Sequence, residues 1–281
     1  MTILEESAWA KLNLSLAVLG KRGDGYHELD MVMQSVSLHD DVRITVEERG
    51  DWSIAGENMP LDEHNLAWKA ADAYFADTEL RPGLAIAIEK RIPSQAGLGG
   101  GSADAAAVLR ALNRHFCLHS EAELSARALR VGSDVPYCLI GGTKRAMGKG
   151  ERLTELPALP KCAILIVKPP CACSTAALYA AIDRESEIPK PDTAALCAAL
   201  EKGDLKAIGA ALCNAFEPLA CRTHSEIAAV LTLLRTGGCL GAAMTGSGSA
   251  CFALYEDEAA ARTAADALRD DRRKIFLAEP V

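Results

Sequence analysis

The chain has 281 residues, of which 49% are hydrophobic and only 5% aromatic, so a core must be built mostly from Ala, Leu, Val and Ile. Thirty Lys and Arg against 38 Asp and Glu give a formal net charge of −8, which argues against non-specific nucleic-acid binding because such binding requires a basic surface. The N-terminus has early acids, and no run of about 18 apolar residues occurs, so we expect neither a signal peptide nor a membrane span.

The first half of the chain mixes strand and helix patterns. Residues 41–47 and 84–88 carry apolar residues at every second position, which is typical of half-buried strands. Apolar residues at helical spacing predict helices over 65–75, over 102–113 after a glycine-rich segment, and over 122–131.

The segment 153–161 contains two prolines and is typical of a linker. Beyond it we predict strands over 162–167, 240–244, 250–255 and 274–278, and helices over 174–183, 192–201, 204–214, 224–235 and 257–270. Because strands and helices are mixed without strict alternation, we predict an α+β protein of two domains, residues 1–154 and 155–281.

The chain has ten cysteines and no CxxC pair, and we interpret most of the cysteines as small core residues of a reduced compartment. Cys171 and Cys173 are potential zinc ligands, but no second pair completes a set of four. His115 and His119, four residues apart, are another potential metal pair, at a predicted helix end without a nearby acidic motif. The residues that bind a metal are therefore unknown from the sequence.

The strongest local signal is the segment PSQAGLGGGSAD at 93–104, in which four of the five positions 97–101 are glycine. Glycines let a ligand approach the backbone, and the following helix points unpaired N–H groups and its positive dipole end at the loop. Such a loop is typical of a phosphate site, where Ser102 can cap the helix or contact a phosphate or its metal ion. The Walker A and dinucleotide patterns both fail, because the loop lacks Lys and Ser102 replaces the third glycine. A flexible turn is the alternative.

Three further segments carry candidate catalytic groups. Lys11 and Asn13 share one face of an expected strand, although a Lys there is also typical of a solvated face. Asp134 follows a predicted helix and can be a simple turn residue, and TGSGS at 245–249 can be a hairpin turn or a second wall near a phosphate. In combination they supply what phosphoryl transfer needs: an Asp to accept the hydroxyl proton and a Lys to stabilise the developing negative charge.

In this order the motifs resemble those of the GHMP kinases, the family of galacto-, homoserine, mevalonate and phosphomevalonate kinases. The segments that carry the resemblance are AKLN at 10–13, GLGGGSADAA at 97–106 and GSGS at 246–249. GYHEL at 25–29 and GSDVP at 132–136 are similar to the branch that phosphorylates a cytidyl diphosphate sugar alcohol in the non-mevalonate route to isoprenoids. The resemblance covers essentially the whole chain.

The resemblance implies transfer of the γ-phosphoryl group of ATP, with Mg²⁺, to the 2-hydroxyl group of that substrate. It also implies an N-terminal domain with a left-handed βαβ unit and a ferredoxin-like C-terminal domain. The family's catalytic positions fall on Lys11 and on Asp134, the latter as the base. Its ATP contacts fall on Pro93, Ser94, Gln95, Ala96, Gly97, Leu98, Gly99, Gly100, Gly101, Ser102, Ala103 and Asn65. Its contacts to the cytidyl substrate fall on Asn13, Tyr26, His27, Thr175 and Tyr179.

The side chains of Tyr26 and His27 suit a substrate that carries a base. Tyr26 offers a π-face on which a base can stack, and His27 offers polar groups that can read its edge. A packing aromatic and a hydrogen-bonded loop residue are the alternatives. Near Thr175 and Tyr179 the sequence departs from the family pattern, because CAC at 171–173 stands where a prolyl-glycyl stretch is expected.

Three other functions compete with this one. A sibling kinase acting on homoserine or a mevalonate derivative would have no base to stack on Tyr26. A nucleotide-binding module without catalysis would not need Lys11 and Asp134, and an RNA-binding protein would not be acidic and poor in aromatics. We expect a cytoplasmic enzyme with a small-molecule substrate and with neither nucleic-acid nor membrane partners. Its oligomeric state is not readable from the sequence.

Overall fold

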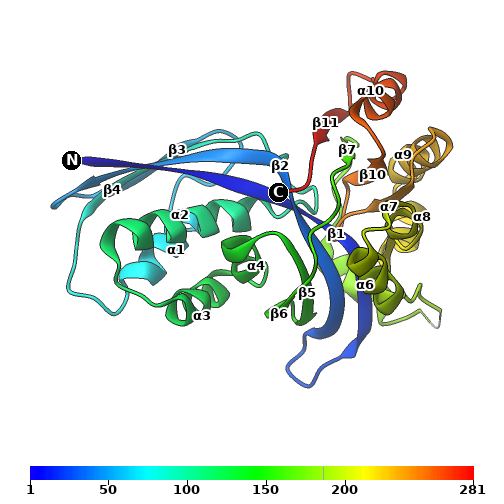
Figure 1. Ribbon diagram of the computed structural model, residues 1–281. Helices are drawn as coiled ribbons and strands as arrows, with labels where there is room; N and C mark the ends of the chain where they lie inside the picture. Colours follow the sequence, from blue (N-terminus) through cyan, green and yellow to red (C-terminus); the bar gives the residue numbers. More distant parts are fainter. Residues whose placement is uncertain (186) are drawn as a thin grey trace. The chain divides into compact units, whose positions relative to one another are not determined.

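The computed structural model describes residues 1–185 and 187–281, and Figure 1 follows them in chain order from blue to red. The described chain divides into two compact units, which we call unit 1 (residues 1–10, 38–94 and 99–141) and unit 2 (residues 11–37, 95–98 and 142–281). Two long strands, β1 (Thr2–Lys21) and β2 (His27–Glu47), contribute residues to both units. The domain ranges 1–154 and 155–281 stay a prediction.

Unit 1 is a sheet covered on one face by helices (Figure 1). Strand β4 (Gly83–Glu89) pairs antiparallel with residues 41–47 of β2 and parallel with β3 (Trp52–Gly56). Val42, Ile44 and Val46 are buried, as their alternation predicts. The covering helices are α1 (Leu66–Phe75), α2 (Gly100–Phe116), α3 (Glu121–Val131) and α4 (Val135–Ile140).

Local chemistry explains where these helices begin. Asn65 caps α1 by accepting a hydrogen bond from Ala67 N (2.9 Å), and Ser120 and Glu123 form a reciprocal capping box at the start of α3. Helix α2 is rich in buried alanine, which allows its neighbours to pack closely. Helix α4 is only six residues long and carries Pro136 in its first turn, and the sequence did not reveal it.

Unit 2 contains a four-stranded antiparallel sheet in the order β11-β7-β10-β9. Its strands are β7 (Ala163–Lys168), β9 (Gly241–Met244), β10 (Cys251–Tyr255) and β11 (Lys274–Ala278). Its helices are α5 (Thr175–Ile182), α6 (Thr193–Lys202), α7 (Leu205–Ala210), α8 (Glu217–Thr223), α9 (Ser225–Thr236) and α10 (Glu258–Ala267). Helices α7, α9 and α10 pack on the strands of this sheet.

Three short strands also belong to unit 2. Strand β5 (Thr143–Gly148) pairs antiparallel with residues 29–34 of β2 and with β6 (Arg152–Glu155). The two-residue β8 (Cys213–Asn214) pairs parallel with Ser15 and Leu16 of β1. The α+β fold class is confirmed.

Two sequence expectations are corrected. The segment 153–161 is not wholly a linker, because residues 153–155 belong to β6 and hydrogen-bond to β5. The helix expected over 204–214 ends at Ala210, and Cys213 and Asn214 pair with β1 instead, since a long-range backbone partner overrides local helical propensity.

The cysteines are less buried than we expected. All ten are free, but only Cys138, Cys162 and Cys251 are buried, while Cys117 is exposed and the others are partly exposed. Burial raises the pKa of Cys162 to about 12, which makes this thiol inert near neutral pH. The interpretation as core residues therefore holds for a minority of the cysteines.

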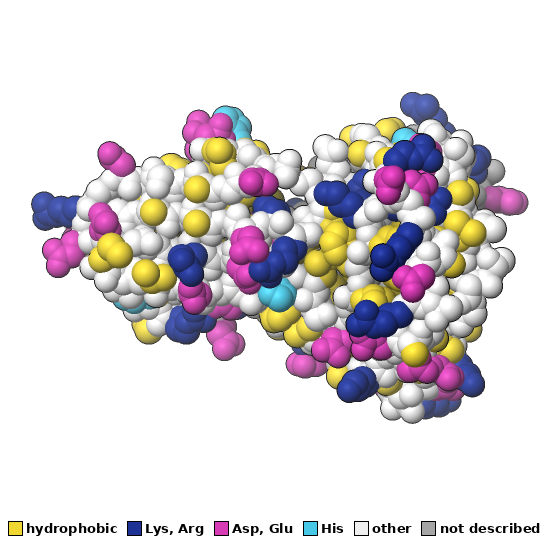
Figure 2. Space-filling view, turned by 90° about the horizontal axis from the view of Figure 1, so that it is seen from above, with side chains coloured by type: hydrophobic (Ala, Val, Ile, Leu, Met, Phe, Trp, Pro, Cys, Tyr) yellow, Lys and Arg dark blue, Asp and Glu magenta, His cyan; other side chains and the backbone are white. Residues whose placement is uncertain are grey.

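Charges of both signs are mixed on one face of the molecule (Figure 2). Figure 2 shows Lys and Arg side chains interspersed with Asp and Glu on the face it presents. Exposed ion pairs of this kind include Arg91 with Asp41 and Glu89. Among the described residues, no helix has the length and apolar character needed to cross a bilayer.

Candidate active site

The glycine-rich loop leads into helix α2 with an unusual backbone. Gln95, Gly97 and Gly99 have positive φ values of 54°, 75° and 71°. Gly99 is the N-cap and the helix starts at Gly100, two residues before the predicted start, so Ser102 lies in the first turn and does not cap it. Since no side chain caps α2 among the described residues, its first N–H groups face the loop as anion donors.

The first part of this loop packs against residues 245–249 (TGSGS), which we call the second glycine-rich segment. A Cβ atom on Gly97 would collide with the carbonyl oxygen of Thr245 and would lie 3.0 Å from Gly248 N. A Cβ on Gly246 would lie 2.9 Å from Gly97 O and 3.2 Å from Lys11 Nζ. Glycine is required at both positions because two backbone segments approach each other closely there.

Lys11 and Asn13 meet the same two segments within unit 2. Lys11 is 4% exposed, donates its backbone N–H to Leu98 O (3.0 Å) and donates Nζ to Asn13 Oδ1 (2.6 Å). Asn13 is 1% exposed and donates its backbone N–H to Thr245 Oγ1 (3.0 Å). Both residues lie on β1, as their alternation predicts, and they are buried and not solvated.

Asn214 holds the second glycine-rich segment in shape, and sequence reasoning missed it. Its Nδ2 donates to Met244 O (2.7 Å) and to Gly246 O (2.9 Å). The residue was expected inside a helix, 32 positions from Gly246, so no local signal pointed to this contact. Thr245, which is fully buried, adds a hydrogen bond from Oγ1 to Gly97 O (3.3 Å).

Asp134 occupies the N-cap position of α4 in unit 1 and is half-buried. Its carbonyl oxygen accepts a hydrogen bond from Cys138 N (3.0 Å), while its carboxylate makes no capping bond to the helix. The residue therefore starts a helix by its backbone, and a catalytic role for its side chain stays a prediction.

A buried ionic cluster that we did not predict lies in unit 1, next to the start of α2. Lys90 Nζ donates to Asp104 Oδ2 (2.7 Å) and to Asp40 Oδ2, and Asp40 Oδ1 accepts from the backbone N–H of Arg91 (2.5 Å) and Ile92 (2.7 Å). Asp40 and Asp104 are 0% and 3% exposed. A Cβ on Gly100 would lie 3.4 Å from Lys90 Nζ, so the cluster supports the first turn of α2.

The cluster has a shifted protonation equilibrium. Burial raises the pKa of Asp104 to about 7 despite the opposing charge of Lys90. Burial lowers the pKa of Lys90, but the Asp104 and Asp40 carboxylates outweigh this and raise it overall. Asp104 Oδ1 has no hydrogen-bond partner among the described residues.

Among the remaining residues predicted to contact ATP, some side chains are held in local hydrogen bonds and others are buried. Asn65 has both polar atoms in local bonds, since Oδ1 caps α1 and Nδ2 donates to Pro60 O (2.8 Å). Ser94 Oγ donates to Asn58 O (3.3 Å). The side chains of four others are buried, so these residues can meet a ligand only through their backbone: Pro93, Ala96, Leu98 and Ala103.

The predicted substrate residues His27 and Tyr179 lie together in unit 2. Their rings stack with centroids 4.5 Å apart at 18°, and His27 Nε2 contacts Asp183 Oδ1 at 2.7 Å. Asp183 also pairs with Lys21 (3.0 Å), and hydrogen bonds from His27 and Lys21 lower the pKa of its carboxyl. Asp183, 156 residues from His27, fixes this ring and was not found from the sequence.

Tyr26 and Thr175 are both exposed. Tyr26 is 56% exposed, and Lys149 Nζ lies 4.6 Å from the centroid of its ring. Thr175 begins α5 and its Oγ1 bonds Ser247 Oγ (2.8 Å), which links α5 to the second glycine-rich segment. The Tyr26 ring is therefore accessible to solvent, as is Thr175.

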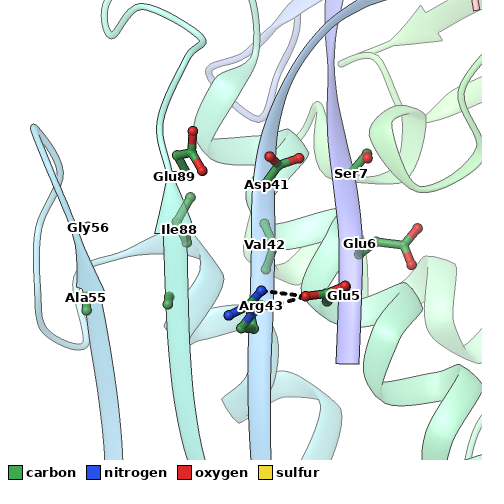
Figure 3. A pocket seen from close by; sticks show the side chains of 11 residues that line it. Glu5, Glu6, Ser7, Asp41, Val42, Arg43, Ala55, Gly56, Ile88 and Glu89 are labelled. Carbon is green, nitrogen blue, oxygen red and sulfur yellow. Dashed lines mark hydrogen bonds and ion pairs between the residues drawn. The ribbon is translucent and has the colours of Figure 1, made fainter. Parts of the chain in front are cut away.

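A separate pocket of about 700 Å³ opens on the uncovered face of the unit 1 sheet (Figure 3). Its polar lining comes from neighbouring strands, and Arg43 Nη2 pairs with Glu5 Oε1 (2.7 Å). None of the residues predicted to bind ATP or substrate lines it, so we assign it no part in the reaction. In the potential histidine pair, one ring nitrogen of His119 contacts Tyr74 O (2.8 Å).

Comparison with known proteins identifies this arrangement. Residues 65–142 match the model of the GHMP kinases N terminal domain, and residues 196–273 match that of the GHMP kinases C terminal region. A 4-diphosphocytidyl-2-C-methyl-D-erythritol kinase of Desulfitobacterium hafniense (strain Y51) is 44% identical over 98% of this chain and 94% of its own length.

Solved structures agree with that match. The crystal structure of a 4-(cytidine 5'-diphospho)-2C-methyl-D-erythritol kinase superposes with a TM-score of 0.83 at 37% identity, covering 99% of each chain. A homoserine kinase from Cytophaga hutchinsonii superposes with a TM-score of 0.78 at 19% identity over 99% of this chain and 94% of its own, which shows the shared fold alone. The chain therefore belongs to the GHMP kinase family, within the group of 4-diphosphocytidyl-2-C-methyl-D-erythritol kinases.

Proposed function

We propose that this chain, an ATP-dependent small-molecule kinase, uses Asp134 and Lys11 to phosphorylate the 2-hydroxyl group of 4-diphosphocytidyl-2-C-methyl-D-erythritol. The products are the 2-phosphate and ADP, in the non-mevalonate route to isoprenoids. The observation that carries the proposal is the convergence of Lys11, the Gly97 segment and the Thr245–Gly248 turn, in a chain related to this kinase over nearly its full length.

The proposed chemistry is a direct transfer. The acceptor oxygen forms a bond to the γ-phosphorus as the bond from that phosphorus to the β,γ-bridging oxygen breaks, and Asp134 takes the hydroxyl proton. Lys11 Nζ, held by Asn13 Oδ1 at 2.6 Å, supplies a fixed positive charge toward the developing negative charge. A fixed charge is more effective than a mobile one because it needs no reorganisation during the step.

The ATP phosphates are proposed to lie on residues 93–103. The left-handed backbone at Gly97 and Gly99 and the uncapped start of α2 support this assignment, because both turn backbone N–H groups toward an anion. Mg²⁺ is part of the proposal: it keeps several waters and phosphate oxygens and needs only one or two protein ligands. The half-buried Ser102 hydroxyl, in the first turn of α2, fits that donor type. When bound, the ion neutralises phosphate charge.

The cytidyl group is proposed to contact Tyr26, His27, Asn13, Thr175 and Tyr179. The exposed ring of Tyr26 and the stacked pair of His27 and Tyr179 support base recognition by aromatic faces. A cytoplasmic location is part of the same proposal, since the reaction consumes ATP.

The test of the reaction is ADP release with Mg-ATP and each of three acceptors. We expect turnover only with 4-diphosphocytidyl-2-C-methyl-D-erythritol. Turnover with homoserine or mevalonate would overturn the substrate, and ATP binding without turnover on any acceptor would favour a nucleotide-binding module without catalysis.

The base assignment predicts that Asp134→Asn removes turnover and keeps ATP binding. Loss of a general base costs roughly 10²–10⁴-fold in rate, and Asn keeps the size and the helix-starting position of Asp134. Single-turnover kinetics and equilibrium ATP binding should be measured on the same preparation. A rate within a few-fold of the wild-type rate would exclude Asp134 as the base.

The stacking assignment predicts that Tyr26→Ala raises KM for the cytidyl substrate and leaves KM for ATP nearly unchanged. Stacking of a base on an aromatic ring contributes about 1–3 kcal/mol, which corresponds to a rise in KM of roughly 5- to 150-fold. Tyr26→Phe, which keeps the ring, is the matched control and should resemble the wild type. Equal rises in both KM values would remove Tyr26 from the cytidyl pocket.

A further inference from the structure

A cluster of three metal-ligand side chains lies in unit 2 and takes no part in the proposed reaction. The Sγ atom of Cys171, a ring nitrogen of His224 and a carboxylate oxygen of Glu226 all lie within 4.8 Å of one another. Cys171 follows β7, His224 is the residue between α8 and α9, and Glu226 lies in the first turn of α9. Cys171 and His224 are half-buried and Glu226 is exposed.

The donor set selects a class of metal ion. Thiolate, imidazole and carboxylate together suit Zn²⁺ and its borderline neighbours, whereas Mg²⁺ and Ca²⁺ prefer oxygen donors throughout. Ligands on a tetrahedral Zn²⁺ lie about 3.5 Å apart, given bond lengths of roughly 2.0–2.3 Å. The present separations, at most 4.8 Å, need to close by no more than about 1.3 Å, which rotation of the three side chains can supply.

Backbone contacts hold two of the three ligands in place. The carbonyl oxygen of Cys171 accepts hydrogen bonds from Lys168 Nζ (2.5 Å) and Ser249 Oγ (2.5 Å). The backbone N–H of His224 donates to Ala220 O (2.8 Å). A site whose ligand backbones are fixed before binding loses less entropy when the ion arrives.

The side chains themselves are available. In the part of the chain that the structure describes, no hydrogen bond or ion pair engages the His224 imidazole or the Glu226 carboxylate. The Glu226 carboxylate lies beside the Cys171 sulfur, and a dication can bind both groups.

We propose that Cys171, His224 and Glu226 bind one Zn²⁺-class dication, with water in the fourth position. The site joins the segment after β7 to the start of α9. It is independent of the proposed kinase reaction, because none of its ligands is assigned to ATP or to the acceptor.

The test uses the full chain, reduced and stripped of metal, and Co²⁺ as the spectroscopic probe. We expect one equivalent of Co²⁺ to give a thiolate-to-cobalt charge-transfer band that Zn²⁺ abolishes by displacement. Cys171→Ser should lose the band, and His224→Asn and Glu226→Gln should each weaken Co²⁺ binding roughly tenfold or more. Cys239→Ser and Cys117→Ser, which alter thiols outside the cluster, should retain the band at full affinity.

The metal-free variants are first compared with the wild type by circular dichroism and thermal unfolding, so that misfolding is not mistaken for a lost ligand. The exposed Glu226→Gln variant provides a second test that does not disturb packing. Absence of a thiolate band in the wild type, a band that survives in Cys171→Ser, or unchanged affinity in both Glu226→Gln and His224→Asn would overturn the proposal.

Discussion

Each unit of the molecule buries a lysine beside a glycine-rich segment, and the two surroundings differ. Lys90, in unit 1, donates to two aspartates, and one of them is also held by backbone N–H groups. Lys11, in unit 2, donates within its own unit to the neutral amide of Asn13 and lies against Gly246. Lys90 thus lies between two carboxylates, whereas Lys11 donates to an amide beside a glycine-rich segment.

The difference suggests that Lys90 serves stability and Lys11 serves turnover. Two carboxylates around Lys90 compensate its charge and tie the segment before the loop to helix α2, which is a structural role. Around Lys11, Gly97 and Gly246 leave the backbone without side chains, and the ammonium group donates to the Asn13 amide. Substitution of the two lysines should therefore separate stability from turnover.

The largest effect is expected from Lys90→Met at pH 8. Removing the ammonium group leaves Asp40 and Asp104 buried without their cation, and breaking a buried pair in this way costs about 3–5 kcal/mol of unfolding free energy. Urea denaturation measures it. Arg43→Met, which breaks an exposed pair with Glu5 in the same unit, is the control and should cost less than about 1 kcal/mol. Equal losses in the two variants would contradict a structural role for Lys90.

Lys11→Met should lower turnover strongly and the unfolding free energy only moderately. We expect turnover to fall roughly 10²–10³-fold, as when one fixed electrostatic group is removed from an active site. The unfolding free energy should fall by only about 1–3 kcal/mol, because Asn13 Oδ1 loses one donor. Lys144→Met is the matched control, since Lys144 is also buried in unit 2 but pairs with the exposed Glu155. Turnover that falls equally in both variants would remove the distinction between the two lysines.

The sequence indicated the segments around Lys11 but not the ionic cluster around Lys90. The glycine-rich loop is a local signal, glycine density before a helix, and Lys11 and Asn13 share one face of a strand and match the family's motif. The cluster around Lys90 was not predicted, because Asp40 is 50 residues away in sequence and Asp104 is 14 residues away. Only the folded sheet and helix bring them together.

The same reason explains the other omissions. Asp183 meets His27 across 156 positions, and Asn214 meets Gly246 across 32 positions, so neither left a pattern within one element. Short helices such as α4, with six residues, are too brief to display a helical period. The sequence thus indicated the fold class, the helix that follows the loop and the motif residues, while the partners that orient those residues required tertiary structure.

The smallest expected effect concerns Asp104 and pH. Its pKa is raised to about 7 in the folded protein from an ordinary value of 3.8, so between these values the folded state holds one proton more than the unfolded state. Stability from this group is therefore present at low pH and is lost as pH rises toward 7, by up to about 1.4 kcal/mol per pH unit. Asp104→Asn cannot titrate, so its unfolding free energy should lack that slope.

Urea denaturation of the wild type and Asp104→Asn at pH 5, 6 and 7 measures the effect. Relative to the variant, the wild type should lose roughly 2 kcal/mol across this range and little more above pH 7, where Asp104 is ionised in both states. Parallel curves would mean that Asp104 is ionised throughout. Lys90 would then face two ionised carboxylates across this pH range, with a net charge of −1 in the cluster.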